Sequence, residues 1–215
     1  STDRKTVENG KWYGGKPIWC LAQENELITA AYFWVGSEAK IDGCQPNYYY
    51  NYDNKTTNKA RFDKIIEWLE LPISERPRLI TVYFSDVDHT GHGYGPNTKE
   101  TENSVKDLDQ KLGELMAKLN DIDLNINLIV VSDHGMFELK QSNKILLDAM
   151  LNWDELKRSN NDAFSMIYES DTNKVNSIYA YLKKLELGKF KTYKKQEIPE
   201  SLHFRNNNRI GDIVL

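Results

Sequence analysis

Two short stretches of this sequence combine carboxylates and imidazoles, and each follows an apolar run. The first stretch holds Asp88 and His92, and the second holds Asp133 and His134. Carboxylate oxygens and imidazole nitrogens are both ligands that zinc accepts. Open α/β sheets place their sites at the carboxyl edge of the strands, so we expect the two stretches to converge on metal.

Each spacing by itself is weak evidence for a metal, because a hydrogen-bonded loop histidine is the simpler alternative. The chain has only four histidines, however, and His92, His134 and the downstream His203 all have candidate ligand positions. The fourth, His89, lies within the first stretch and is interpreted as a bystander. For Asp86 two interpretations stay open: an acceptor that orients a ligand imidazole, or a solvated loop acid.

Alternating strand-like and helix-like segments are expected to position these residues. Apolar runs rich in β-formers predict strands at 27–34, 79–84, 126–131, 164–168 and 190–193, and a final strand that ends at 215. Helical spacing of apolar residues predicts helices at 17–25, 61–71, 97–122 and 173–187. The glycine-rich segment 83–96 and the tyrosine-rich segment 41–59 are predicted as loops, and 137–164 as a polar insertion over the site.

This alternation predicts an α/β fold with a largely parallel sheet flanked by helices. The segment 126–131 is almost continuously apolar, which is typical of a strand buried on both faces of such a sheet.

Composition limits the classes of protein to which the chain can belong. It has 215 residues, of which 40% are hydrophobic and 28% charged, the proportions of an ordinary globular domain. Its formal net charge of -4 provides no basic field that would attract a nucleic-acid duplex. No apolar run approaches the roughly 20 residues that span a bilayer. Cys20 and Cys44 either form one disulfide or stay as two buried thiols, and the sequence does not decide between these.

Five segments, in one order along the chain, resemble motifs of the nucleotide pyrophosphatase/phosphodiesterase family of the alkaline phosphatase superfamily. They are Lys11 to Trp19, Phe33 to Glu38, Asp88-His89-Thr90-Gly91-His92 with Gly95-Pro96, Ser132-Asp133-His134-Gly135-Met136, and Leu202-His203-Phe204 with Asn208-Arg209-Ile210. The resemblance runs from about residue 11 to the end. It implies an alkaline-phosphatase-like α/β fold in which residues 1–215 are the later part of the catalytic domain, incomplete at the N-terminal side.

The resemblance also implies two zinc ions in one site. Asp88, His92 and His203 would hold one ion, and Asp133 and His134 would hold the other. In the family, an upstream Asp and a Thr or Ser nucleophile complete the second ion, and both precede the segment that begins at Lys11. No residue of this chain is therefore assigned as the nucleophile. Two cations can bind the attacking and leaving oxygens of an in-line phosphoryl transfer.

Tyr52 matches the family's position for an aromatic side chain that stacks on a nucleotide base. Such stacking contributes about 1–3 kcal/mol per base. Trp34 and Glu38 match positions near the same pocket. Four of the five residues from Tyr48 to Tyr52 are tyrosines, and the alternative for this cluster is a half-buried loop whose hydroxyls reach the surface.

By this resemblance the full-length protein is expected to be a zinc-dependent hydrolase. Its substrates would be phosphodiester or pyrophosphate bonds of nucleotides or related small molecules, and its location extracellular, periplasmic or at the cell surface. Three alternatives stay open. One is an inactive metal-binding fragment or non-catalytic relative, because no nucleophile is assigned. Another, within the superfamily, is a phosphomonoesterase or a lipid head-group phosphodiesterase. The third is a soluble α/β domain that binds no metal. The 215 residues alone are expected to be inactive.

Overall fold

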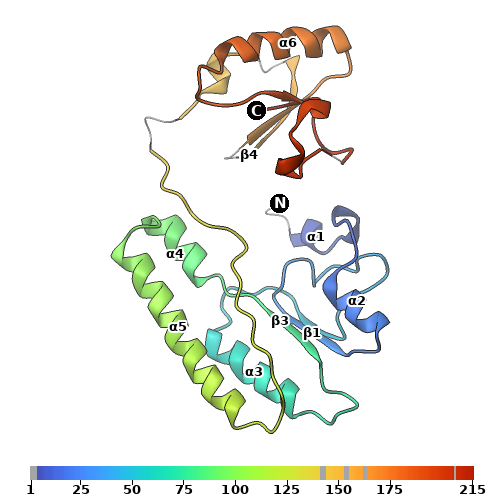
Figure 1. The fold of residues 1–215 in the computed structure, drawn as a ribbon, viewed down its shortest axis with the longest axis vertical. Coiled ribbons are helices and arrows are strands. Elements are labelled where there is room, and N and C mark those ends of the chain that lie inside the picture. The colour runs from blue at the N-terminus through green and yellow to red at the C-terminus, as the bar shows by residue number, and fades with distance from the viewer. Residues whose placement is uncertain (1–3, 141–143, 153–154, 162–163, 206) are drawn as a thin grey trace. The chain divides into compact units, whose positions relative to one another are not determined.

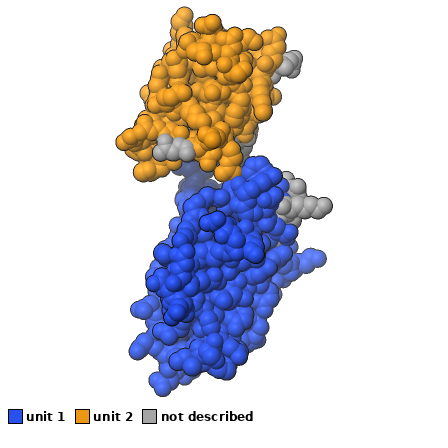
Figure 2. Space-filling view, turned by 90° about the vertical axis from the view of Figure 1, so that its right-hand side faces the viewer, with its two compact units in different colours: residues 1–138 blue, residues 139–215 orange. Residues whose placement is uncertain are grey.

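The computed structural model describes residues 4–140, 144–152, 155–161, 164–205 and 207–215. The chain divides into two compact units, residues 1–138 and residues 139–215, which are coloured separately in Figure 2. Each unit is described by itself below. No helix within the described ranges combines the length and the apolar character that crossing a bilayer requires.

Unit 1 contains a parallel sheet and five α-helices among its described residues (Figure 1). Its elements are α1 (Arg4–Val7), the 3-10 helix η1 (Gly10–Trp12), α2 (Ile18–Glu24), β1 (Thr29–Tyr32), β2 (Tyr48–Tyr50), α3 (Asn58–Glu70), β3 (Leu79–Val82), α4 (Asp86–Tyr94) and α5 (Lys99–Asn120). The strands lie in the order β2-β1-β3, and both pairings are parallel. The predicted α/β class is therefore confirmed.

Helices α3 and α5 pack together over the sheet, because each turns an apolar stripe toward it. Both begin at a threonine N-cap: the hydroxyl of Thr57 accepts from the Ala60 N–H, and that of Thr98 from the Thr101 N–H. The buried cluster between them consists of Phe62, Ile65, Leu69, Leu115 and Leu119, and Ile80 and Val82 of β3 pack against it. This packing fixes the position of the strand that leads into α4.

The tyrosine cluster is a strand where a loop is predicted. Tyr48 to Tyr50 form β2, whose partner in the parallel register is β1. The rings of Tyr32 and Tyr50 stack with centroids 4.6 Å apart, and Trp68 of α3 lies 6.0 Å from both rings. Consecutive tyrosines suit an edge strand because aromatic side chains pack well on a pleated, half-buried surface.

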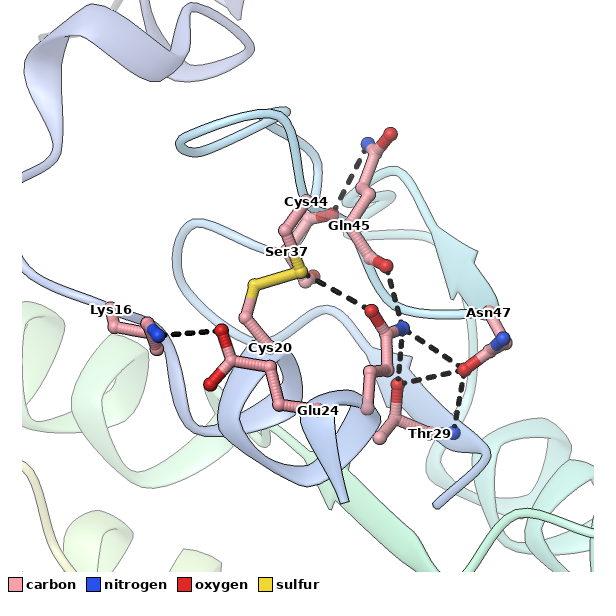
Figure 3. Close-up of a disulfide and its surroundings, with 9 residues drawn as sticks. Lys16, Cys20, Glu24, Thr29, Ser37, Cys44, Gln45 and Asn47 are labelled. Atoms are coloured by element: carbon pink, nitrogen blue, oxygen red, sulfur yellow. Dashed lines mark hydrogen bonds and ion pairs between the residues drawn. A yellow bond between two sulfur atoms is a disulfide. The ribbon is translucent and has the colours of Figure 1, made fainter. Parts of the chain in front are cut away.

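A disulfide joins Cys20 of α2 to Cys44, which settles the pairing that the sequence leaves open (Figure 3). Their Cα atoms are 6.0 Å apart, a distance that a disulfide spans readily. Beside it, Nε2 of Gln23 donates to Oγ1 of Thr29 at 3.0 Å and to the carbonyl of Gln45 at 2.8 Å. Together these bonds tie α2 to the start of β1 and to the turn that precedes β2.

Residues 126–131, predicted as a doubly buried strand, form no strand in the structure. The side chains of Leu128, Ile129, Val130 and Val131 are 45%, 80%, 70% and 68% exposed. Apolar composition predicts burial, but burial and pairing both require a neighbouring strand. Among the described residues β3 pairs only with β1, so no neighbour is present on the side where 126–131 lies.

Unit 2 has a small antiparallel sheet covered by one helix. Its elements are η3 (Leu147–Ala149), β4 (Lys157–Asn161), β5 (Phe164–Tyr168), α6 (Thr172–Leu185), β6 (Tyr193–Lys194), η5 (Lys195–Glu197), η6 (Glu200–Leu202) and β7 (Ile213–Val214). The strand order is β4-β5-β7-β6. The predicted strand 164–168 and helix 173–187 are confirmed, whereas β4 lies in the stretch predicted as an insertion. An edge strand such as β4 can be polar throughout, which hides it from a search for apolar runs.

Candidate functional site

The segment predicted as a glycine-rich loop contains helix α4 instead. Asp86 and Asp88 occupy its first turn, where the helix dipole favours carboxylates. Asp88 and His92 are one turn apart on the same helix face, and Oδ1 of Asp88 lies 3.4 Å from Nε2 of His92. The glycines did not prevent the helix. Only Gly95, with φ of 99°, ends it in a conformation that favours glycine.

The second pair lies beside the first. Oδ2 of Asp133 is 3.5 Å from Nε2 of His134, and the same nitrogen is 3.9 Å from Oδ1 of Asp88. Nδ1 of His134 lies 2.9 Å from the carbonyl oxygen of Gly135. When Nδ1–H donates this hydrogen bond, the lone pair of Nε2 is free to bind a metal. The structure therefore brings four of the five predicted metal ligands together.

The separations within each pair can be compared with zinc geometry. Two ligand atoms bound to one tetrahedral zinc at 2.0–2.1 Å lie about 3.3 Å apart. The Asp88–His92 separation of 3.4 Å and the Asp133–His134 separation of 3.5 Å are both close to this value. Each pair therefore fits one ion.

Each pair also needs further ligands, because catalytic zinc takes three or more protein ligands. Within the described ranges no group of three or more His, Cys, Asp or Glu side chains is arranged to hold an ion. Neither pair is therefore a complete zinc site within the described ranges.

His203, the fifth predicted ligand, belongs to unit 2. It follows η6 in a left-handed conformation with φ of 48° and ψ of 33°, and its backbone N–H donates to the Glu200 carbonyl at 2.9 Å. Its side chain is exposed. The two units are described separately, so the ligand role of His203 stays a prediction.

Two pKa values near the site are raised. The Gly135 carbonyl, followed by the Asp133 carboxylate, raises the pKa of His134 above its ordinary value. Burial raises the pKa of the Tyr83 phenol, and the carboxylates of Asp88 and Asp133 raise it further. Tyr83 is therefore a neutral phenol beside the acidic pairs at neutral pH.

Arg61 of α3 secures the end of β3 just before α4. It is 3% exposed, and it donates from Nη1 to the Tyr83 carbonyl at 2.8 Å and from Nη2 to the Thr56 carbonyl at 3.1 Å. Its guanidinium carbon lies 5.0 Å from the ring centroid of Phe33 and 5.6 Å from that of Phe84. Aromatic faces attract a cation, so these rings stabilise the buried charge.

Two further contacts position α4. Oδ1 of Asp86 accepts a 2.9 Å hydrogen bond from Nδ2 of the buried Asn58, so Asp86 ties α4 to the first residue of α3 and is not a solvated loop acid. A Cβ atom on Gly91 would lie 2.4 Å from Sδ of Met136. Gly91 therefore permits the close contact between α4 and the segment that carries Asp133 and His134.

Tyr52 lies next to the start of α4. Its hydroxyl donates to Oγ of Ser85 at 3.2 Å, and its backbone N–H donates to Oε1 of Glu38 at 2.8 Å. Its ring meets the Phe33 ring edge-on, with centroids 5.2 Å apart. Trp34 is partly buried and packs against the cluster around Trp19. The predicted base-stacking role of Tyr52 is untested by these contacts.

Comparisons with known proteins all indicate the same family. The family model for type I phosphodiesterase / nucleotide pyrophosphatase matches residues 1–215. A venom phosphodiesterase of Crotalus durissus collilineatus is 35% identical over 232 residues, which cover 100% of this chain and 27% of the relative. Ectonucleotide pyrophosphatase/phosphodiesterase family member 1 of Rattus norvegicus is 31% identical, covering 100% of this chain and 25% of the relative. The chain thus spans well under half the length of these curated relatives.

Solved structures agree with the sequence comparison. Murine ectonucleotide pyrophosphatase/phosphodiesterase 5 superposes with a TM-score of 0.84 at 31% identity, covering 96% of this chain and 55% of the murine chain. An inactive variant of the same murine protein, solved in complex with AMP, gives the same values. The human protein has a TM-score of 0.87 at 30% identity.

Proposed function

The chain belongs to the type I phosphodiesterase / nucleotide pyrophosphatase family, and on this premise we propose that the full-length protein hydrolyses phosphodiester or pyrophosphate bonds of nucleotides with the help of two zinc ions. One observation carries the proposal: Asp88–His92 and Asp133–His134 lie side by side, and the ligand atoms of each pair are separated as on one zinc ion. The AMP complex of a structural relative supports a nucleotide as the substrate.

Each residue has a proposed role in that site. Asp88 and His92 hold one ion together with His203, and Asp133 and His134 hold the other. Bound in this way, two zinc ions would supply charge stabilisation for the attacking and leaving oxygens of the phosphoryl group. The bond from His134 to the Gly135 carbonyl would leave Nε2 as the nitrogen that binds an ion, because an orienting partner fixes both tautomer and ring angle.

Tyr52 is proposed to carry the nucleotide base. Its backbone bond to Glu38 and its hydroxyl bond to Ser85 hold the ring at the start of α4, the helix that carries Asp88 and His92. We propose that a base stacked on this ring would direct its phosphate toward the metals. The nucleophile, a Thr or Ser, is proposed to come from a part of the protein outside these 215 residues.

The proposed location is outside the cytosol. A disulfide such as Cys20–Cys44 persists in oxidising compartments. The names of the relatives, venom phosphodiesterases and ectonucleotide pyrophosphatases, agree with an extracellular or cell-surface enzyme.

The test is a pair of assays on the full-length protein. We expect hydrolysis of a nitrophenyl nucleotide diester to exceed that of nitrophenyl phosphate, to stop after chelation and to return with added zinc. A large preference for nitrophenyl phosphate would instead indicate a phosphomonoesterase. Failure to hydrolyse either compound with zinc bound would indicate a non-catalytic relative.

A further inference from the structure

Unit 2 carries a lysine-rich surface at the end of α6. The segment 183–195 contains six lysines and one glutamate, although the whole chain has a formal net charge of -4. We call these lysines the lysine patch: Lys183, Lys184, Lys189, Lys191, Lys194 and Lys195. Positive charge is therefore concentrated locally, and such a patch can attract an anionic partner that the net charge would repel.

Contacts within unit 2 draw the lysine patch together. The carboxylate of Glu186 accepts from Nζ of Lys183 at 2.8 Å and from the backbone N–H of Thr192 at 2.6 Å, so the loop after α6 folds back onto the end of the helix. The ring centroid of Tyr179 lies 5.9 Å from Nζ of Lys183 and 4.9 Å from Nζ of Lys194. Lysines of α6 and β6 therefore lie on one surface, and the loop lysines lie between them in the chain.

Most of the charge on the lysine patch is not neutralised by an ion pair. Among the described residues, Lys183 is the one member that pairs with a carboxylate. By contrast, all six lysines of α3 and α5 form ion pairs with carboxylates of the same two helices. Within the part of the chain that the structure describes, five lysines of the patch thus keep their charge for an external partner.

An exposed leucine lies within the same segment. Leu187 is 82% exposed, the highest value among the exposed large apolar side chains of the described residues. Its φ of 39° is in the left-handed region that leucine rarely occupies, and Gly188 follows with φ of 76°. A backbone conformation of this kind costs energy and occurs preferentially at functional sites. The turn therefore exposes an aliphatic side chain in the middle of the lysine-rich segment.

We propose that the lysine patch and Leu187 bind the protein to the surface of an anionic lipid bilayer. Lysines attract anionic headgroups, and an aliphatic side chain among them can enter the boundary between headgroups and acyl chains. A single-stranded polynucleotide fits less well, because its bases need exposed aromatic rings on which to stack. Phe190 and Tyr193, the aromatic residues of the segment, are only partly exposed. This peripheral contact does not depend on the proposed hydrolytic function.

Vesicle flotation of the full-length protein tests the proposal without a measurement of hydrolysis. We expect the protein to bind vesicles of phosphatidylglycerol mixed with phosphatidylcholine, and not vesicles of phosphatidylcholine alone. Added salt should weaken the binding, because ions screen exposed charges. If the protein does not bind the anionic vesicles, the proposal is wrong.

Two triple variants with the same change in net charge locate the contact. The patch variant is Lys184→Gln, Lys189→Gln and Lys191→Gln, and the matched control in α5 is Lys99→Gln, Lys106→Gln and Lys111→Gln. Each lysine near an anionic surface contributes about 5-fold to affinity, so the patch variant should bind anionic vesicles about 100-fold more weakly than wild type. The control removes ion-paired lysines and should bind nearly as well as wild type. Equal losses in the two variants would contradict the proposal.

Leu187→Ser tests the apolar part of the contact. It should weaken binding to anionic vesicles about 10-fold, because a leucine side chain would no longer be buried. Since Leu187 is exposed, the variant should keep the wild-type thermal midpoint. Unchanged vesicle binding in this variant would exclude Leu187 from the contact and overturn the proposal as stated.

A single-stranded oligodeoxythymidine, with a chelator present to prevent hydrolysis, tests the other class of partner. At equal total phosphate, we expect the full-length protein to bind the oligonucleotide more weakly than the anionic vesicles. Tighter binding to the oligonucleotide that is lost in the patch variant would show that the lysine patch is a nucleic-acid surface. That result would contradict a role in lipid binding.

Discussion

At the scale of single residues, the two histidines of α4 show how helical position separates a ligand from a bystander. His92 lies one turn after Asp88, so their side chains meet at 3.4 Å. His89 directly follows Asp88 and is turned about 100° away around the helix axis. Both histidines are exposed, so burial does not explain the difference.

This contrast gives a matched pair of variants. In the full-length protein, His92→Gln is expected to lower bound zinc below two equivalents. It should also lower kcat/KM by more than about 100-fold, because loss of a residue that only orients a ligand already costs about 10- to 100-fold and loss of the ligand itself should cost more. His89→Gln should leave both quantities near wild type. Metal analysis and nucleotide diester hydrolysis provide the measurements. Equal losses in the two variants would contradict the ligand assignment.

A second prediction at this scale concerns Tyr52. Replacing it with Ala removes the proposed stacking platform, so KM for a nucleotide diester should rise about 5- to 150-fold, the equivalent of 1–3 kcal/mol. Tyr52→Phe loses the hydroxyl bond to Ser85 but keeps the ring, and should stay close to wild type. For a nitrophenyl phosphodiester that lacks a base, Tyr52→Ala should change KM little. If Tyr52→Ala raises KM as much for the substrate without a base as for the nucleotide diester, Tyr52 has a structural role and does not contact the base.

Arg61 is a residue whose buried position the sequence could have indicated. It precedes Ile65 by one helical turn, so it shares the buried face of α3 with an apolar stripe. A charged residue on such a face indicates that its charge is paired or hydrogen-bonded inside the protein. The carbonyls of Tyr83 and Thr56, however, come from other segments and could be identified only in the folded chain.

At the scale of elements, local preferences predicted most helices and several strands but misjudged two segments near the site. Glycines suggested a loop at 83–96, whereas two acids in the first turn and the contact between Gly91 and Met136 stabilise α4. Tyrosines suggested a loop at 41–59, whereas β2 forms by pairing with β1. In each case a contact distant in sequence outweighed the local preference.

The disulfide provides a prediction for helix α2. Cys20 and Cys44 are 24 residues apart, and in the chain-entropy model closing a loop of this length stabilises the fold by about 3.5 kcal/mol. The double variant Cys20→Ser with Cys44→Ser should unfold at a lower temperature than wild type. Reductant should lower the unfolding temperature of the wild type toward that of the variant and should leave the unfolding temperature of the variant unchanged. An unchanged midpoint in the variant would show that the Gln23 hydrogen bonds alone hold α2 in place.

At the scale of the whole molecule, the chain carries only part of the proposed site. Unit 1 brings the two pairs of proposed ligands together and also contains an apolar cavity and an uncovered apolar segment. Unit 2 carries His203 on a separate antiparallel framework. The family resemblance assigns no nucleophile to any of the 215 residues.

The isolated 215-residue chain is therefore expected to show no turnover of a nucleotide diester, even in the presence of zinc. The physical reason is that the proposed two-metal phosphoryl transfer needs a hydroxyl nucleophile and two complete metal shells. The assay compares this chain with the full-length protein at equal concentration and equal zinc content. Robust zinc-dependent hydrolysis by the isolated chain would contradict the proposal that the nucleophile and the remaining metal ligands lie outside these 215 residues.

The sequence by itself determined the family, the α/β class and the residue types of the proposed metal site, because these are carried by short motifs and by local periodicity. It predicted that Asp88, His92, Asp133 and His134 converge, since parallel strands bring their carboxyl ends to one edge. Only the tertiary structure decided that Asp88 and His92 lie on a helix, that Cys20 binds Cys44, and that Arg61 and Asn58 anchor the site. It also left 126–131 uncovered, because pairing and burial depend on a neighbour and not on the apolar residues alone.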